Sequence, residues 1–149
     1  MMRVKVSTLL NAPVDRVWDT VKKPQTLVRV SRGVMRFGGA DKWPSRWREG
    51  EDVQTRFFFF GFLPAFWIHH LRVVRLNDQR REVLTNERGG LIHRWDHFIQ
   101  VDEEAEGRSR YTDRIEIGAG LLTPVVWAYA HLFYRYRQMN WRRLARELR

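Results

Sequence analysis

The sequence predicts an α+β fold in which a curved antiparallel sheet of about seven strands wraps on one long C-terminal helix. Apolar residues alternate near the N-terminus, and six further strand-like segments separated by turn signals follow between residues 33 and 117. From about Leu122 to Leu148 the spacing of apolar residues becomes helical. A single helix covers only one face of such a sheet, so this face and the helix must enclose the core.

The first elements are a strand and two short helices. In the segment 4–10 every second residue faces the same way, which is typical of a strand. Pro13 opens a segment with apolar residues at helical spacing, and Pro24 ends it, so 13–23 predicts a short helix and 25–30 a second one. The strands that follow are expected at 33–38, 52–60, 66–76, 81–88, 91–101 and 109–117.

Length and composition indicate one packed domain over residues 1–149. Apolar residues make up 44% of the chain and aromatic residues 13%, which is too rich for disorder. The absence of cysteine excludes disulfides, thiolate nucleophiles and cysteine-bound zinc, and it predicts a reducing, cytoplasmic setting. Residues 117–134 contain no Lys, Arg, Asp or Glu, but Pro124, His131, Thr123 and two glycines favour a buried or cavity-lining helix over a membrane span.

The chain shows none of the usual signatures of a metal, cofactor or nucleophile site. It has no phosphate-binding loop ending in Gly-Lys-Ser/Thr and no Gly-x-Ser-x-Gly elbow. His69 and His70 are neighbours on a strand and point to opposite faces, so they cannot hold one ion together. We therefore expect no metal, no cofactor and no catalytic residue.

Two titratable residues, His97 and Asp113, lie in rows that should face the core. If Val101 lies opposite Ser109 in the hairpin of the last two strands, His97 falls directly across from Asp113. An imidazole beside a carboxylate reduces the cost of burying both. The pair either anchors the sheet or lines a ligand cavity, and a catalytic dyad would lack its nucleophile. The two rows are Trp95, His97, Ile99, Val101 and Tyr111, Asp113, Ile115, Ile117.

The long helix carries a second charge on its apolar side. Its arginine stripe (Arg135, Arg142, Arg146, Arg149) should be solvated, and its opposite row (Val126, Ala130, Phe133, Trp141, Leu144, Leu148) should face the sheet. Arg137 lies in the middle of the apolar row. We expect it to reach an inward acid, Asp113 first and Glu87 as the fallback, unless it snorkels to an edge.

The segment 57–60 places phenylalanines on both faces of a hairpin. Phe57 and Phe59 share one face, and Phe58 and Phe60 share the other. Only one set can line the interior. The other set should pack on a helix, on a partner subunit or on a membrane.

The sequence resembles the SRPBCC superfamily, the helix-grip proteins related to START lipid-transfer domains, polyketide cyclases and the birch-pollen allergen. The likeness covers nearly the whole chain, through "VSTLLNAPVDRVWDTV", "GGLIHRWDHFIQV", "RYTDRIEIGAG" and "FYRYRQ". Trp95, His97 and Asp113 match the Trp, His and Asp positions of a bacterial pattern. Leu91-Ile92 and Ile117-Gly118 depart from it at the expected mouth of the pocket. The resemblance implies a helix-grip fold and a cavity.

Three functions are compatible with these patterns. The leading hypothesis is a non-enzymatic binder, or transporter, of a hydrophobic, aromatic or lipid molecule held between the sheet and the long helix. The second is a cyclase or dehydratase that uses His97, Asp113 and Arg137. The third follows from the net charge of +10 and is an anionic-membrane or nucleic-acid surface binder, although we do not expect nucleic acid because the aromatic residues belong to core rows. The sequence leaves open whether the protein forms a homodimer. The expected ligand-binding residues are Trp95, His97, Tyr111, Asp113, Phe133, Arg137 and Trp141.

Overall fold

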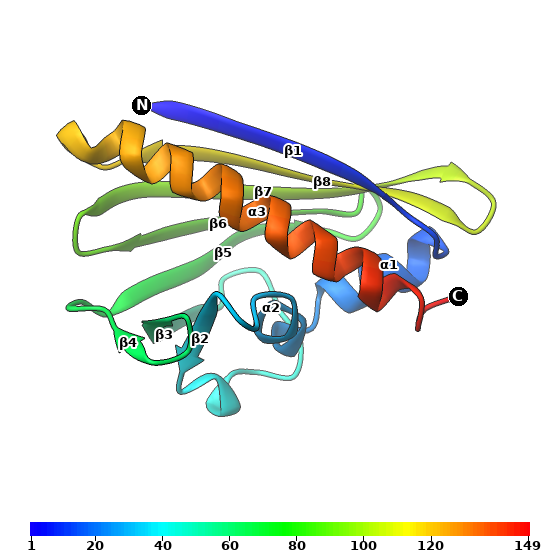
Figure 1. Ribbon diagram of the computed structural model, residues 1–149. Coiled ribbons are helices and arrows are strands. Elements are labelled where there is room, and N and C mark those ends of the chain that lie inside the picture. Colours follow the sequence, from blue (N-terminus) through cyan, green and yellow to red (C-terminus); the bar gives the residue numbers. More distant parts are fainter.

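Seven antiparallel strands form one continuous curved sheet, and a two-residue strand is added at its side (Figure 1). The computed structural model describes all residues, 1–149. The order along the sheet is β1-β8-β7-β6-β5-β3-β2, with β4 paired to β3. The strands are β1 (Met2–Leu10), β2 (Met35–Gly38), β3 (Asp52–Phe59), β4 (Leu63–Pro64), β5 (His69–Asn77), β6 (Glu82–Gly89), β7 (Ile92–Ala105) and β8 (Arg108–Gly118).

One long helix lies along the inner side of the curved sheet, as the sequence predicts (Figure 1). This helix is α3 (Thr123–Ala145), and a short 3₁₀ turn, η2 (Gly120–Leu122), leads into it. The two short helices α1 (Val14–Val21) and α2 (Pro24–Val30) follow β1, and η1 (Ala40–Lys42) follows β2. No helix combines the length and the apolar character needed to cross a membrane.

Side-chain hydrogen bonds hold α3 against β1 at three points along the helix. Trp127 Nε1 donates to the carbonyl oxygen of Arg3 at 2.8 Å, and Gln138 Nε2 donates to that of Val6 at 2.9 Å. Further along, Arg142 Nη1 donates to a threonine hydroxyl of β1 at 2.9 Å. These bonds set the rotation of the helix, so the arginine stripe is exposed and Ala130, Phe133, Trp141 and Leu144 are buried, as expected.

The predicted pairing of β7 with β8 is wrong by two residues. β7 continues to Ala105 and β8 begins at Arg108, so the hairpin turns within two residues instead of across the acidic segment 102–107. His97 therefore lies opposite Ile115, and Ile99 lies opposite Asp113. Because the side-chain repeat of a strand is two residues, a shift of two leaves both rows facing inward.

Candidate ligand-binding cavity

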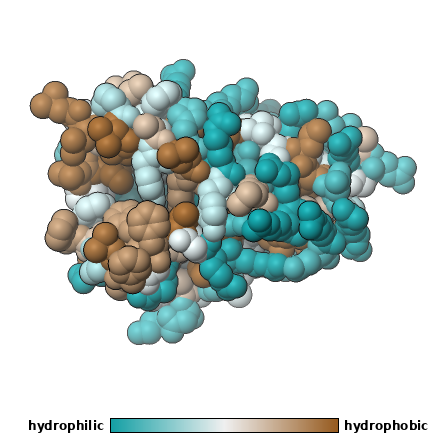
Figure 2. Space-filling model, viewed as in Figure 1, coloured by the Kyte–Doolittle hydropathy of each residue, from teal (hydrophilic) through white to brown (hydrophobic).

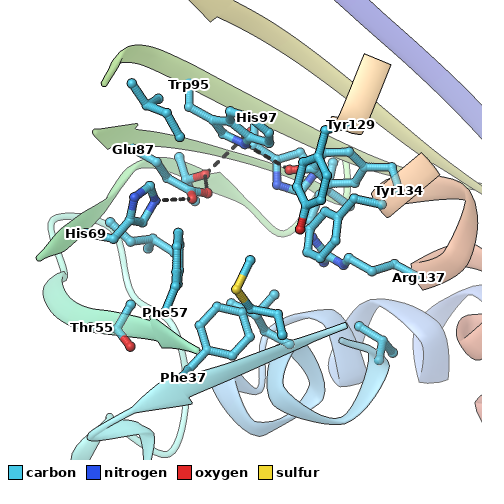
Figure 3. A pocket seen from close by; sticks show the side chains of 18 of the residues that line it. Phe37, Thr55, Phe57, His69, Glu87, Trp95, His97, Tyr129, Tyr134 and Arg137 are labelled. Carbon is cyan, nitrogen blue, oxygen red and sulfur yellow. Dashed lines mark hydrogen bonds and ion pairs between the residues drawn. The ribbon is translucent and has the colours of Figure 1, made fainter. Parts of the chain in front are cut away.

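A cavity of about 380 Å³ lies between the sheet and α3 (Figure 3). Of the 30 residues that line it, 23 are hydrophobic, so its wall is mainly apolar. Six of the seven residues expected at the site border it, namely Trp95, His97, Tyr111, Phe133, Arg137 and Trp141. The seventh, Asp113, does not border the cavity.

Asp113 is fully buried behind the cavity wall, where it holds three neighbouring side chains. His97 Nε2 lies 2.6 Å from Oδ1, which also accepts the hydroxyl of Tyr111 at 3.2 Å. Gln138 Nε2 donates to Oδ2 at 3.0 Å. Asp113 therefore pairs with His97 along a diagonal of the sheet rather than directly across it. Burial, followed by the Asp113 charge, raises the pKa of Tyr111 well above its ordinary value, so the phenol stays protonated.

A second acid–histidine pair, not predicted from the sequence, lies on the neighbouring strands β5 and β6. His69 Nε2 is 2.9 Å from Glu87 Oε2, and Thr85 donates to Oε1 at 3.0 Å. Glu87 lies opposite Leu71, two residues from His69, so this pair repeats the diagonal geometry of the first. The signal was present in the sequence, because His69 shares its row with the buried Leu71 and Val73.

The environment of Glu87 keeps it ionised despite its burial. Burial by itself would raise the pKa of Glu87. The hydrogen bond and the charge of His69, together with the charge of His97, outweigh that effect and hold the pKa below its ordinary value. Glu87 thus places a carboxylate beside His69 in the cavity wall.

Arg137 enters the cavity, but it does not form the ion pair expected from the sequence. The residue is 5% exposed, so the alternative in which it snorkels to an edge is also wrong. Its guanidinium lies 5.6 Å from the ring centre of Phe133 and 5.1 Å from that of Tyr134. Burial by itself would lower the pKa of Arg137, but two neighbouring tyrosines and the acids Asp113 and Glu87 raise it, and the side chain stays charged.

Aromatic side chains supply much of the remaining wall. Of the two phenylalanine sets in 57–60, Phe57 and Phe59 line the cavity, whereas Phe58 lies outside under the guanidinium of Arg36 and Phe60 is exposed. The site reaches both apolar clusters of the core, one near α1 and one near the start of α3. Five of the seven tryptophans of the chain border the cavity: Trp43, Trp47, Trp67, Trp95 and Trp141.

No family model matches the sequence, and no curated protein sequence matches it. Solved structures do match, over almost the whole chain. A START superfamily protein from Mycobacterium smegmatis is 12% identical, with 99% of each chain covered and a TM-score of 0.71. A major latex-like protein from Panax ginseng is 11% identical, with 97% of each chain covered and a TM-score of 0.67. Norcoclaurine synthase from Thalictrum flavum is 12% identical over 93% of this chain and 92% of that one, with a TM-score of 0.62.

The chain has the helix-grip fold. This confirms the fold implied by the sequence motifs, and at these identities the likeness concerns the fold alone. Proteins that share a fold differ in what they bind and whether they catalyse a reaction. The function of this helix-grip protein must therefore be argued from its own cavity.

One wall of the cavity depends on a close approach between a ring and a glycine turn. The indole of Trp67 packs on Gly89 and Gly90, which join β6 to β7. A Cβ atom at Gly90 would lie 2.4 Å from the Trp67 ring, and Gly90 also has a φ of +55°. The two glycines therefore make the turn and leave room for the ring, which is a role that turn signals alone do not reveal.

Proposed function

We propose that this helix-grip protein binds a small hydrophobic or aromatic molecule between its sheet and α3. The observation that carries the proposal is the cavity of about 380 Å³ with 23 hydrophobic residues among 30. Pockets for small molecules commonly measure about 300–1,000 Å³ and combine an apolar wall with a few placed polar groups. The cavity has both properties.

In this proposal the expected site residues divide into three roles. Trp95, Phe133 and Trp141 form apolar wall, and His97, Tyr111 and Arg137 offer polar atoms to the ligand. Asp113 acts through its hydrogen bonds to two of these polar residues.

Binding has better support than a cyclase or dehydratase reaction. Such an enzyme would use His97, Asp113 and Arg137 together on one substrate. Asp113 does not border the cavity, and its carboxylate oxygens are engaged by residues other than Arg137. The three groups are therefore not presented to a ligand as one set.

A cavity-filling variant tests the proposal. The neutral probe 2-naphthalenemethanol should bind the wild-type protein saturably in a calorimetric titration, and native mass spectrometry of the purified protein should detect a bound apolar compound. Val126→Trp should abolish both signals, because Val126 borders the cavity. Leu132→Trp, on the exposed side of the same helix, is the matched control. Equal binding by both variants, or a wild-type protein with neither a saturable titration nor a bound compound, would refute the proposal.

We also propose that one end of the molecule contacts an anionic membrane when the ligand enters or leaves. Large apolar side chains are exposed at this end, which we call the apolar end: Phe60, Phe62, Phe66, Leu91, Leu121 and Val125. Figure 2 shows hydrophobic surface gathered at the end where α3 begins, and hydrophilic surface at the opposite end. Leu91 and Val125 also border the cavity, so the apolar end adjoins its opening. The net charge of +10 favours an anionic surface.

A further inference from the structure

Arg137 is a buried cation that forms no direct ion pair with any acid of the protein. Its side chain borders the cavity and is 5% exposed, and its Nε atom has no hydrogen-bond partner. A guanidinium does not lose its proton at physiological pH, so it cannot avoid the cost of burial by becoming neutral. The rings of Phe133 and Tyr134 supply only a weak cation–π contact.

Each oxygen of the two acids nearby, Asp113 and Glu87, already has a hydrogen-bond partner. Both oxygens of Asp113 accept hydrogen bonds, Oδ1 from His97 and Tyr111 and Oδ2 from Gln138. Both oxygens of Glu87 are likewise bound, to one threonine and one histidine. Neither acid forms an ion pair with Arg137. The two acids act on Arg137 only at a distance, and the chain leaves the guanidinium without a direct ion-pair partner.

Most of the unpartnered buried polar atoms on residues that border the cavity are hydrogen-bond donors. Six buried side-chain polar atoms lack a partner, and five of them belong to residues that border the cavity. Four of these five are N–H donors, from Arg137 and from the indoles of Trp43, Trp67 and Trp141. An unsatisfied buried donor is costly, and a ligand with acceptor atoms removes that cost.

The hydroxyl of Tyr134 adds a donor beside Arg137. Its oxygen accepts the indole N–H of Trp95 at 2.9 Å, so its own hydrogen is available to a ligand. Burial raises the pKa of Tyr134 well above its ordinary value, so the hydroxyl keeps that hydrogen. Figure 3 shows Arg137, Tyr134 and Tyr129 on the helix side of the cavity, facing His69, Glu87 and His97 on the sheet side.

We propose that the ligand is an organic anion, an apolar body with a carboxylate that binds to Arg137 and the Tyr134 hydroxyl. The inference rests on the proposed binding function and specifies the chemical class of the ligand. The carboxylate supplies the direct ion-pair partner and the acceptor oxygens that Arg137 lacks, and the apolar body matches the rest of the wall. Fatty acids and aromatic acids share this chemistry.

Matched acid and alcohol probes test the inference. Dodecanoate is compared with 1-dodecanol, and 2-naphthoate with 2-naphthalenemethanol, by calorimetric titration at neutral pH. Each pair shares its carbon skeleton, so the difference in affinity reports the head group, and the two pairs distinguish a fatty acid from an aromatic one. In the wild type, at least one acid should bind about tenfold or more tightly than its alcohol, which is the scale of a charge-assisted hydrogen bond.

Arg137→Gln should reduce that preference to about twofold or less and leave the affinity for the alcohol unchanged. Arg135→Gln is the matched control: it removes the same charge from the exposed face of the same helix, and the acid preference should persist. If the arginine served only to hold the structure, Arg137→Gln would weaken acid and alcohol alike, and the inference would be overturned.

The wild-type titrations alone decide the matter even if Arg137→Gln fails to fold. Equal binding of acid and alcohol would overturn the inference and leave the proposed binding function intact. Binding of none of the four probes would overturn both.

Discussion

Two inward-facing carboxylates, Glu87 and Asp113, are held by different sets of partners. Asp113 has three hydrogen-bond donors and no exposure. Glu87 depends on one threonine and on the charge of His69, and it borders the cavity. The lowered pKa of Glu87 therefore depends on His69.

Glu87 should make the stability of the protein depend on acid. Its pKa is lower in the folded chain than in the unfolded chain, so its contribution is complete above the unfolded-state value of about 4.3 and is lost as the pH falls through the folded-state value. Glu87→Gln should unfold with a free energy that falls less steeply than that of the wild type below about pH 4.3. Urea unfolding at a series of pH values measures this difference. Parallel curves for the two proteins would contradict it.

At the scale of single residues, the sequence predicted which side chains face inward but not which of them meet. Alternation along β7 and β8 places His97 and Asp113 on the inner face, and helical spacing places Arg137 there. The partners depend on strand register and side-chain rotamers. The long β7–β8 hairpin shifted the strand register by two residues. Both acids pair with histidines, so Arg137 has no acid as an ion-pair partner.

At the scale of elements, the strands and the long helix follow from periodicity, whereas the connections do not. Six predicted strands correspond to β2, β3, β5, β6, β7 and β8 within a few residues. The largest departures are at the acidic β7–β8 turn and at 60–68, where a two-residue strand and an irregular stretch replace the simple turn expected there. The spacing of apolar residues predicts which face of a strand is buried, but it does not predict at which residue a hairpin turns.

The Gly89–Gly90 turn should affect the cavity as well as the chain reversal. Gly90→Ala strains a residue with φ of +55° and drives a Cβ atom into the ring of Trp67, which borders the cavity. Gly107→Ala is the control, since Gly107 has a φ of +72° but no atom within 4 Å of its Cβ position. Both variants should lose stability, by about 1 kcal/mol from backbone strain. Only Gly90→Ala should also weaken binding of 2-naphthalenemethanol, and equal affinities would refute the link between turn and cavity.

At the scale of the whole molecule, the curved sheet and α3 enclose the site. The surface has two distinct regions, the apolar end and the basic arginine stripe of α3. The general architecture could be predicted because one long helix has only one sheet face to cover. The apolar end could not, because its residues come from three separate segments, around 60–66, at 91 and at 121–125. Only the folded chain brings them together.

The apolar end should bind vesicles that contain phosphatidylglycerol. Phe66 is 99% exposed, so inserting its ring into a bilayer gains about 2 kcal/mol of burial. Phe66→Ser should therefore reduce vesicle co-sedimentation at low salt by about tenfold or more. Val74→Ser removes an exposed apolar side chain from β5, away from the apolar end, and should co-sediment like the wild type. Indifference of the binding to Phe66→Ser would exclude this surface as the point of contact.

The placement of the tryptophans gives the protein an intrinsic optical signal. Five indoles border the cavity, and three of these have an unpartnered N–H. The other two are held elsewhere, Trp18 by Asp78 at 2.8 Å and Trp127 by the backbone of β1. Indole emission responds to the polarity and hydrogen bonding around the ring, so a ligand in the cavity should change the emission of the five rings that border it. A colourless compound could then be screened in the unlabelled protein, with Trp18 and Trp127 providing a constant background.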